Sequence, residues 1–333
     1  MTSTLTPGAT DEAAPSHGIT VGLKNRLQQF LAFASLLVIF AFFSFASPNF
    51  FSYSNVTNIL FSTVVIGTLA LGTTFVIITA GIDLSIGTGM ALSAVMAGVF
   101  ITNMGLPIGV GVVLTILFGG LIGLVNGFNV AVLNIPPFIA TLAMMLVAQG
   151  LALVISHSAP IYFSEDPGYV KISTGNLIPN FPNAVLILFA AAIISGILLT
   201  RTVLGRYTYS IGSNEEATAL SGINVRKWKI VIYACAGLFI GLAGVMISAR
   251  LGSAQPATGF GYELQAIAAV VIGGTSLAGG KGSIVGTVIG ALIISVINNG
   301  LQIMSIPQEW QNVILGVVIL FAVYADMVRK RET

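Results

Sequence analysis

Charged residues are scarce in this chain. Of its 333 residues only 7% are Asp, Glu, Lys or Arg, while 56% are hydrophobic, and the mean hydropathy is +0.98. Soluble domains carry roughly 25% charged residues. Because no soluble fold can hide this much apolar surface from water, we interpret the chain as an all-α polytopic membrane protein.

Cysteine and histidine are almost absent. The single cysteine, Cys235, excludes an internal disulfide, and the two histidines, His17 and His157, lie in a tail and at a loop edge. The chain also lacks the spaced motifs of metal sites and hydrolases, and it has no basic arm for nucleic acid. We therefore predict no catalytic residue, no metal site and no enzymatic activity.

A phosphate-binding loop is also missing, although one segment imitates it. The glycine-rich run at 273–282 contains Gly280 and Lys281 in the order G-K. In the motif G-x-x-x-x-G-K-[ST], however, Thr275 occupies the place of the first glycine and Gly282 that of the hydroxyl that binds magnesium. We expect the chain to bind neither ATP nor any other cofactor.

Long apolar windows predict about ten transmembrane helices, each close to the roughly 20 residues that cross a bilayer. A disordered N-terminal tail is expected at 1–27, a transmembrane domain at 28–326 and a basic tail at 327–333. The windows are 28–46, 56–80, 84–103, 106–132, 136–156, 183–200, 229–249, 262–279, 283–304 and 310–326.

Basic residues indicate the orientation, because short cytoplasmic loops carry an excess of Lys and Arg. If the N-terminus is cytoplasmic, the 201–229 loop, Lys281 and the C-terminal tail lie on the same side. Of the 13 basic residues, all but Lys171 and Arg250 are then cytoplasmic. Both termini are therefore predicted in the cytoplasm. The loop at 157–182 lies outside, as a connector, a lid or a contact surface.

The cytoplasmic loop at 201–229 contains the pattern of a short helix. Ser213 or Asn214 can cap it, Glu215 and Glu216 favour its first turn, and Gly222 is placed to end it. A capped helix on a basic loop suits docking into a cytoplasmic partner, and a solvated connector is the simpler alternative. The residues proposed for docking are Ser213, Asn214, Glu215, Glu216, Ala217, Leu220, Ser221, Gly222 and Ile223.

Asp83 lies among glycines between two apolar windows. An aspartate at the centre of a membrane helix costs roughly 2.5–3.5 kcal/mol. We interpret Asp83, with Ser85 beside it, as a cap at an interrupted helix, and a proton or cation site as the alternative. Carriers driven by ion gradients usually place several charges at the membrane midplane. The scarcity of such charges favours a neutral substrate and energy supplied by another protein.

Amides and one glutamate also lie within the apolar windows. Such groups either hydrogen-bond between helices or line a wet path. The candidate pore or gate residues are Asp83, Ser85, Glu263, Gln265, Asn298 and Asn299. Glycines that recur every four residues, as at Gly119, Gly123 and Gly127, predict closely packed helices instead of chemistry.

Several segments resemble the ribose-type permease subunits of bacterial ATP-binding cassette importers. The resemblance runs from about residue 28 to the end of the chain and includes the spacing of the motifs. The segments are TAGIDLSIG at 79–87, PFIATL at 137–142, LGRY at 204–207, GSNEEAT at 212–218, SGINV at 221–225, SAQP at 253–256 and AAVVIGGTSLAGGKG at 268–282.

This resemblance implies a permease in the bacterial inner (plasma) membrane that forms the pore together with a second permease subunit, as a homodimer. It implies a cytoplasmic ATPase with two nucleotide-binding cassettes, which binds ATP and Mg²⁺, and an extracytoplasmic sugar-binding protein. The 213–223 segment matches the coupling helix of the family, and the implied substrate is a monosaccharide, ribose or a related pentose. The alternative is a gradient-driven secondary carrier for a sugar or polyol.

Overall fold

The chain folds almost entirely into helices. A computed structural model describes residues 17–179 and 181–331. In that part of the chain the strands are β1 (Ile161–Tyr162) and β2 (Ser253–Ala254), which pair antiparallel. The helices are α1 (His17–Ala46), α2 (Tyr53–Ile78), α3 (Ile86–Gly98), the π-helical η1 (Val99–Asn103), α4 (Ile108–Ala131), α5 (Pro137–Ile155), α6 (Pro167–Thr174), α7 (Asn183–Arg201), α8 (Val203–Ser213), α9 (Glu215–Leu220), α10 (Val225–Leu251), α11 (Tyr262–Ile272), α12 (Ile284–Ile303) and α13 (Gln308–Arg331).

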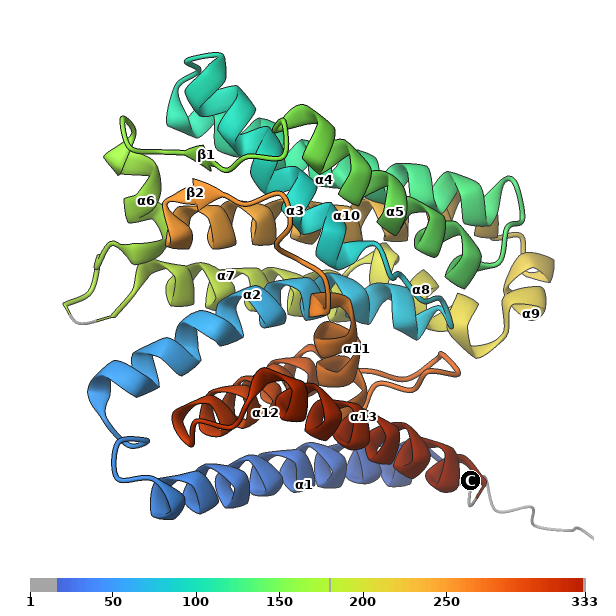
Figure 1. The fold of residues 1–333 in the computed structure, drawn as a ribbon. Helices are drawn as coiled ribbons and strands as arrows, with labels where there is room; N and C mark the ends of the chain where they lie inside the picture. Colours follow the sequence, from blue (N-terminus) through green and yellow to red (C-terminus); the bar gives the residue numbers. More distant parts are fainter. Residues whose placement is uncertain (1–16, 180, 332–333) are drawn as a thin grey trace, which may run out of the picture.

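The long helices pack in layers around α2 (Figure 1). Helices α1, α12 and α13 lie on one side of α2, and α10, α3, α4 and α5 lie on the other, with α10 in contact with both α2 and α4. In the most apolar stretch of α2, 89% of the residues are buried, whereas in that of α5 only 22% are buried. Helix α2 is therefore the centre of the core, and α5 presents an apolar face that suits contact with lipid.

Each of the ten predicted windows contains a helix. By length and composition, seven helical segments in the described residues can cross a membrane: α2, α3 with η1, α4, α5, α7, α10 and α12. Shorter apolar stretches lie at Phe30–Ala46, Tyr262–Ile272 and Gln308–Tyr324. Helices α1 and α13 also extend into the tails predicted at 1–27 and 327–333, whose residues 1–16 and 332–333 lie outside the described residues.

The transmembrane helix predicted at 262–279 is longer than the helix that the structure has there. Helix α11 ends at Ile272 after 11 residues. At 1.5 Å per residue this is about 16 Å, well short of the roughly 30 Å of a hydrocarbon core. Gly274, Gly279 and Gly280 follow with φ angles of 91°, 85° and 73°. Because this region of φ favours glycine, the glycine-rich sequence forms a turn where the hydropathy alone predicted a helix.

Glycines set the distance between α4 and α10. A side chain at Gly119 would collide with the backbone of Gly241, and one at Gly123 with the backbone of Tyr233. Gly290 of α12 meets the backbone of α11 in the same way. These contacts confirm that glycines at four-residue spacing serve close helix packing.

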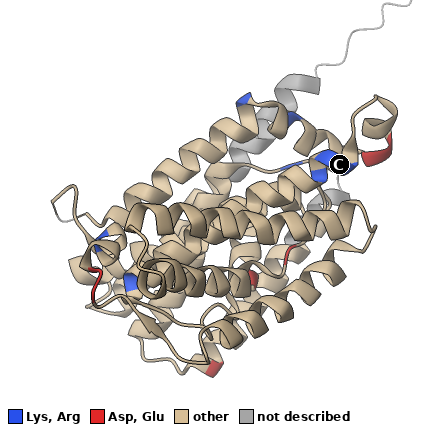
Figure 2. Ribbon diagram, turned by 90° about the horizontal axis from the view of Figure 1, so that it is seen from above, with Lys and Arg blue, Asp and Glu red and all other residues tan. Residues whose placement is uncertain are grey.

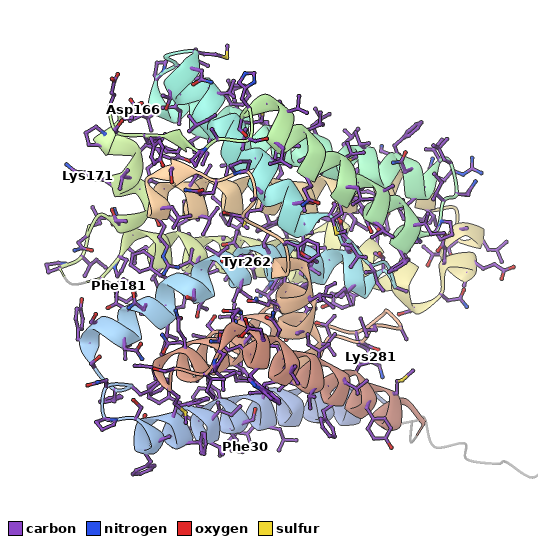
Figure 3. The ribbon with its side chains drawn as sticks, viewed as in Figure 1. Phe30, Asp166, Lys171, Phe181, Tyr262 and Lys281 are labelled. Atoms are coloured by element: carbon purple, nitrogen blue, oxygen red, sulfur yellow. The ribbon has the colours of Figure 1, made fainter. Side chains whose placement is uncertain are left out.

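Charged residues gather towards the ends of the bundle, and few lie between them (Figure 2). Asp166, Lys171 and Phe181 lie at one end, near α6, and Lys281 lies towards the other (Figure 3). The start of α1, the end of α13 and the helices α8 and α9 share the end of Lys281 (Figure 1). We call these the α6 end and the α9 end.

Candidate functional site

A short helix projects from the α9 end of the bundle. The side-chain oxygen of Asn214 caps α9 by accepting a hydrogen bond from the N–H of Ala217 at 2.9 Å. After the helix, Gly222 turns the chain with a φ of 82°. The predicted short helix is thus confirmed. Its cap is Asn214, because Ser213 is the last residue of α8.

Helix α9 presents one face to the surroundings. Leu220 at its tip is 85% exposed. Thr218 faces inwards, is buried, and its hydroxyl donates to the carbonyl of Asn214 at 2.7 Å. Of the residues predicted to dock onto a partner, Ile223 is half-buried, and the exposed ones are Ser213, Asn214, Glu215, Glu216, Ala217, Leu220, Ser221 and Gly222.

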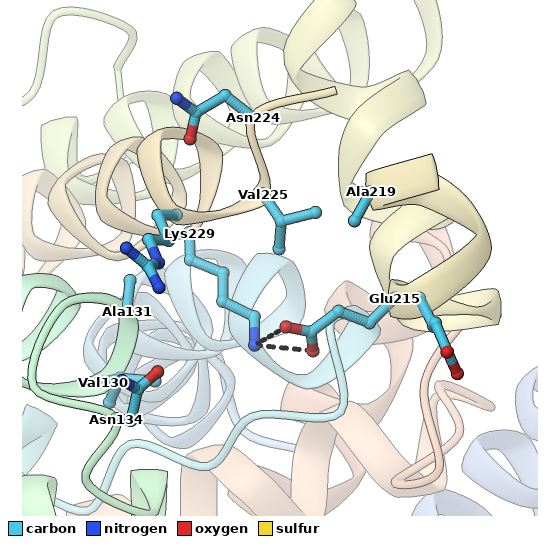
Figure 4. Close-up of a pocket in the computed structure, with 10 residues that line it drawn as sticks. Val130, Ala131, Asn134, Glu215, Ala219, Asn224, Val225 and Lys229 are labelled. Atoms are coloured by element: carbon cyan, nitrogen blue, oxygen red, sulfur yellow. Dashed lines mark hydrogen bonds and ion pairs between the residues drawn. The ribbon is translucent and has the colours of Figure 1, made fainter. Parts of the chain in front are cut away.

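A groove of about 620 Å³ separates α9 from the ends of α4 and α10 (Figure 4). Lys229 of α10 crosses this groove and donates to both carboxylate oxygens of Glu215, each at 2.7 Å. Glu216 and Arg226 also line the groove. The ion pair ties α9 to the start of α10. Since the Glu215 side chain is 53% exposed, the pair adds at most about 1 kcal/mol to stability.

The glycine-rich turn at 273–283 connects three helices near α9. The N–H of Gly280 donates to the carbonyl of Ile78, the last residue of α2, at 2.8 Å. The hydroxyl of Tyr209 in α8 donates to the carbonyl of Gly282 at 2.8 Å. Burial raises the pKa of Tyr209, so its hydroxyl remains protonated and able to donate. The turn is therefore a structural joint between α2, α8 and α12.

Asp83 lies in the buried segment between α2 and α3 and is 1% exposed. Its carboxylate accepts hydrogen bonds from the N–H of Ser85 at 2.9 Å and from the hydroxyl of Ser85 at 2.6 Å. Asn126 of α4 donates to both carboxylate oxygens, at 3.4 and 3.3 Å, and to the Ser85 hydroxyl at 2.8 Å. Asp83 thus orders the start of α3 and links it to α4.

The predicted amides bond across helices. Asn298 of α12 donates to the side-chain oxygen of Gln265 in α11 at 3.0 Å. Asn299 exchanges two hydrogen bonds with Asn55 of α2, at 2.8 and 2.9 Å. For polar groups in apolar windows the two alternatives were hydrogen bonding between helices and lining a wet path. These contacts are of the first kind.

Glu263 lies at the start of α11 and is 4% exposed. Its two carboxylate oxygens accept from the N–H of Gly261 at 2.9 and 3.0 Å. Gly87 at the start of α3 packs so tightly against this region that a side chain there would collide with Glu263 and with the backbone of Gly259. The starts of α3 and α11, two helices that begin after non-helical segments, therefore meet inside the bundle.

Two polar residues of this network were absent from the sequence prediction. Asn55 and Asn126 both lie in or beside long apolar windows. That position is itself the only sign in the sequence that they have partners, because polar groups in apolar helices rarely remain unpaired. Their side-chain partners are Asn299 of α12 for Asn55, and Asp83 and Ser85 ahead of α3 for Asn126. These sequence separations are ones that no local pattern reveals.

The chain is similar to known proteins over nearly its full length. Residues 55–323 match the family described as branched-chain amino acid transport system / permease component. The chain is 46% identical over 299 residues to the ribose import permease protein of Escherichia coli (strain K12), covering 88% of this chain and 91% of the relative. It is 42% identical over 311 residues to the ribose import permease protein of Bacillus subtilis (strain 168), covering 92% and 94%. It is 34% identical over 388 aligned positions to the xylose transport system permease protein of E. coli (strain K12), covering 98% and 99%.

Proposed function

The chain belongs to this family of transport-system permease components, and we propose that it is the membrane-spanning subunit of an ATP-binding cassette importer for a monosaccharide, ribose or a related pentose. The proposal depends above all on the identity of 42–46% to ribose import permease proteins over about nine tenths of each chain. The relative that transports xylose widens the substrate class to pentoses. The protein is a multi-pass protein of the bacterial inner (plasma) membrane.

In this importer α9 is the coupling helix. It docks onto a cytoplasmic ATPase with two nucleotide-binding cassettes, which binds ATP and Mg²⁺ in place of this chain. The capped helix, its exposed Leu220 and its link to α10 through Lys229 support this role. Movement of the ATPase then reaches α10, which lies beside α2, α3 and α4.

The α9 end faces the cytoplasm and the α6 end faces outwards. The basic residues of the 201–229 loop and Lys281 support this orientation, because positive charge concentrates on the cytoplasmic side. An extracytoplasmic sugar-binding protein delivers the sugar at the α6 end. A second copy of this chain completes the translocation pathway as a homodimer.

Reconstitution tests the proposal. The chain is placed in proteoliposomes with its ATPase and sugar-binding protein, and uptake of radiolabelled ribose is measured. We expect uptake to require ATP on the α9 side and the sugar-binding protein on the other, and unlabelled ribose or a related pentose to compete. Uptake driven by an imposed proton or sodium gradient without ATP would support the secondary carrier instead.

A further inference from the structure

The hydroxyl of Tyr233 in α10 is buried without a hydrogen-bond partner. The residue is 1% exposed, and no donor or acceptor in the described part of the chain bonds to its hydroxyl. A buried polar group left unpaired costs about 1–3 kcal/mol. An unpaired group of this kind in a native structure calls for an explanation, and one explanation is that it is used in another conformation.

The segment that carries Asp83 passes close to this hydroxyl. A methyl group placed on Gly81 would lie 2.6 Å from the Tyr233 oxygen, and Asp83 follows two residues later in the same segment. The Asn126 contacts to Asp83, at 3.3 and 3.4 Å, are longer than the usual 2.7–3.2 Å. Three of the four contacts to Asp83 end on Oδ1, and Oδ2 accepts only from Asn126 at 3.3 Å. Because each carboxylate oxygen offers about two acceptor positions, Oδ2 retains capacity for another donor.

Tyr233 also lies on the part of α10 that is connected to α9. It follows Lys229 by four residues, so the two side chains share one face of the helix. Lys229 holds Glu215 of α9 at 2.7 Å. One helix therefore carries both the ion pair with α9 and the hydroxyl beside the segment that precedes α3.

We propose that Tyr233 is a positioning residue whose hydroxyl donates to the Asp83 carboxylate in a second conformation of the transport cycle, reached when α9 displaces α10. The inference rests on the proposed importer function. In the present conformation the donor is held away from its acceptor. In the second, the new hydrogen bond fixes the start of α3 against α10. A contact made in only one of two states shifts the equilibrium between them by the free energy of that contact.

Tyr233→Phe tests this role, because it removes the hydroxyl and keeps the ring. We expect the Tm of the purified protein to be unchanged or raised, since an unpaired buried group is removed. In the reconstituted complex, the amount of sugar imported per ATP hydrolysed should fall about tenfold or more. A hydrogen bond to a charged group is worth about 1.5–3 kcal/mol, and about 1.4 kcal/mol is a factor of ten.

Tyr169→Phe is the matched control. Tyr169 is equally buried, but it lies at the α6 end and its hydroxyl is paired with that of Ser248 at 2.7 Å. This variant should have a lower Tm and the parental ratio of sugar to ATP. A parental ratio in Tyr233→Phe, or a lowered Tm there, overturns the inference. If the parent protein shows no uptake that depends on ATP, the proposed function fails instead.

A double-mutant cycle gives a second, independent readout. Asp83→Asn weakens the acceptor, so it should also lower the ratio of sugar to ATP. Adding Tyr233→Phe to Asp83→Asn should lower the ratio little further, because both changes remove the same contact. If the losses in the ratio of sugar to ATP simply add in the double variant, the two residues have separate functions and the inference is overturned.

Discussion

The side chains of Asn55 and Asn299 face each other across α2 and α12 and exchange two hydrogen bonds, at 2.8 and 2.9 Å. Asn55 is 7% exposed and also donates to the carbonyl of Phe50 at 2.8 Å. The pair therefore satisfies polar groups that the surrounding apolar helices cannot, and it joins the core helix α2 to the α12 layer. Residues paired in this way stabilise the bundle, and their loss is measurable.

Asn299→Leu should lower the free energy of unfolding by about 1–3 kcal/mol, because it removes the donor to the buried side-chain oxygen of Asn55. The double variant Asn55→Leu with Asn299→Leu should lose less stability than the sum of the losses in the two single variants. In the double variant neither amide remains without its partner. Thermal unfolding in detergent measures both effects. An unchanged Tm together with a raised KM for the sugar would instead place Asn299 in the pore lining.

Reversing the charge on α9 should uncouple the transporter. In the variant Glu215→Lys with Glu216→Lys, the ion pair with Lys229 becomes a repulsion and the docking face changes sign. The chain should insert normally, but it should copurify weakly with the ATPase, and uptake should be lost. The control is Glu165→Lys with Asp166→Lys, which reverses one exposed and one half-buried charge near the α6 end. Parental uptake and copurification in the α9 variant would contradict the coupling role.

The purified chain alone should not bind ATP, because Thr275 and Gly282 replace the motif residues of a phosphate loop. Photo-crosslinking of labelled ATP to the isolated permease should give no signal above that of a competitor-blocked sample. The ATPase subunit in the same assay serves as the positive control. Specific labelling of the isolated permease would disprove this prediction.

The loss of stability on replacing Asp83 should depend on whether the new side chain still offers a hydrogen-bond acceptor. Asp83→Asn keeps an oxygen for the Ser85 N–H, so it should cost only part of the roughly 1 kcal/mol of a cap. Asp83→Leu should lower the folded yield much more, because Ser85 and Asn126 then lose a buried acceptor. Yield and Tm after purification measure both. If a proton gradient drives uptake by the parent but not by Asp83→Asn, Asp83 is a proton site.

Glycine contacts between α4 and α10 should tolerate no side chain. Gly123→Ala should lower the Tm, because the new methyl group would collide with the backbone of Tyr233 and push the helices apart. Gly150→Ala in α5 is the matched control, since its added methyl group would meet no atom of another helix within 4 Å. That change should be neutral or stabilising by up to about 1 kcal/mol. Equal Tm values for the two variants would show that α4 and α10 separate without cost.

Local patterns in the sequence were sufficient for much of this fold. Apolar windows predicted where helices lie, because a bilayer demands long apolar stretches whatever packs around them. The glycine spacing on α4 predicted close packing for a similar reason, since it depends on one helix face. The short helix at α9 followed from Asn214, the two glutamates and Gly222, which act within a few residues of one another.

Only the tertiary structure decided which polar residues meet. Asn126 reaches Asp83 over 43 residues and Asn299 reaches Asn55 over 244. No local pattern encodes such pairs, because they depend on how whole helices cross. The end of α11 at Ile272 was also decided by the fold. Hydropathy continued past that residue, but the chain there turns to contact α2 and α8. Composition determined by itself that the protein lies in a membrane. The positions of Tyr233 and Asp83 relative to each other required the packed bundle, because burial and pairing are properties of neighbours in space.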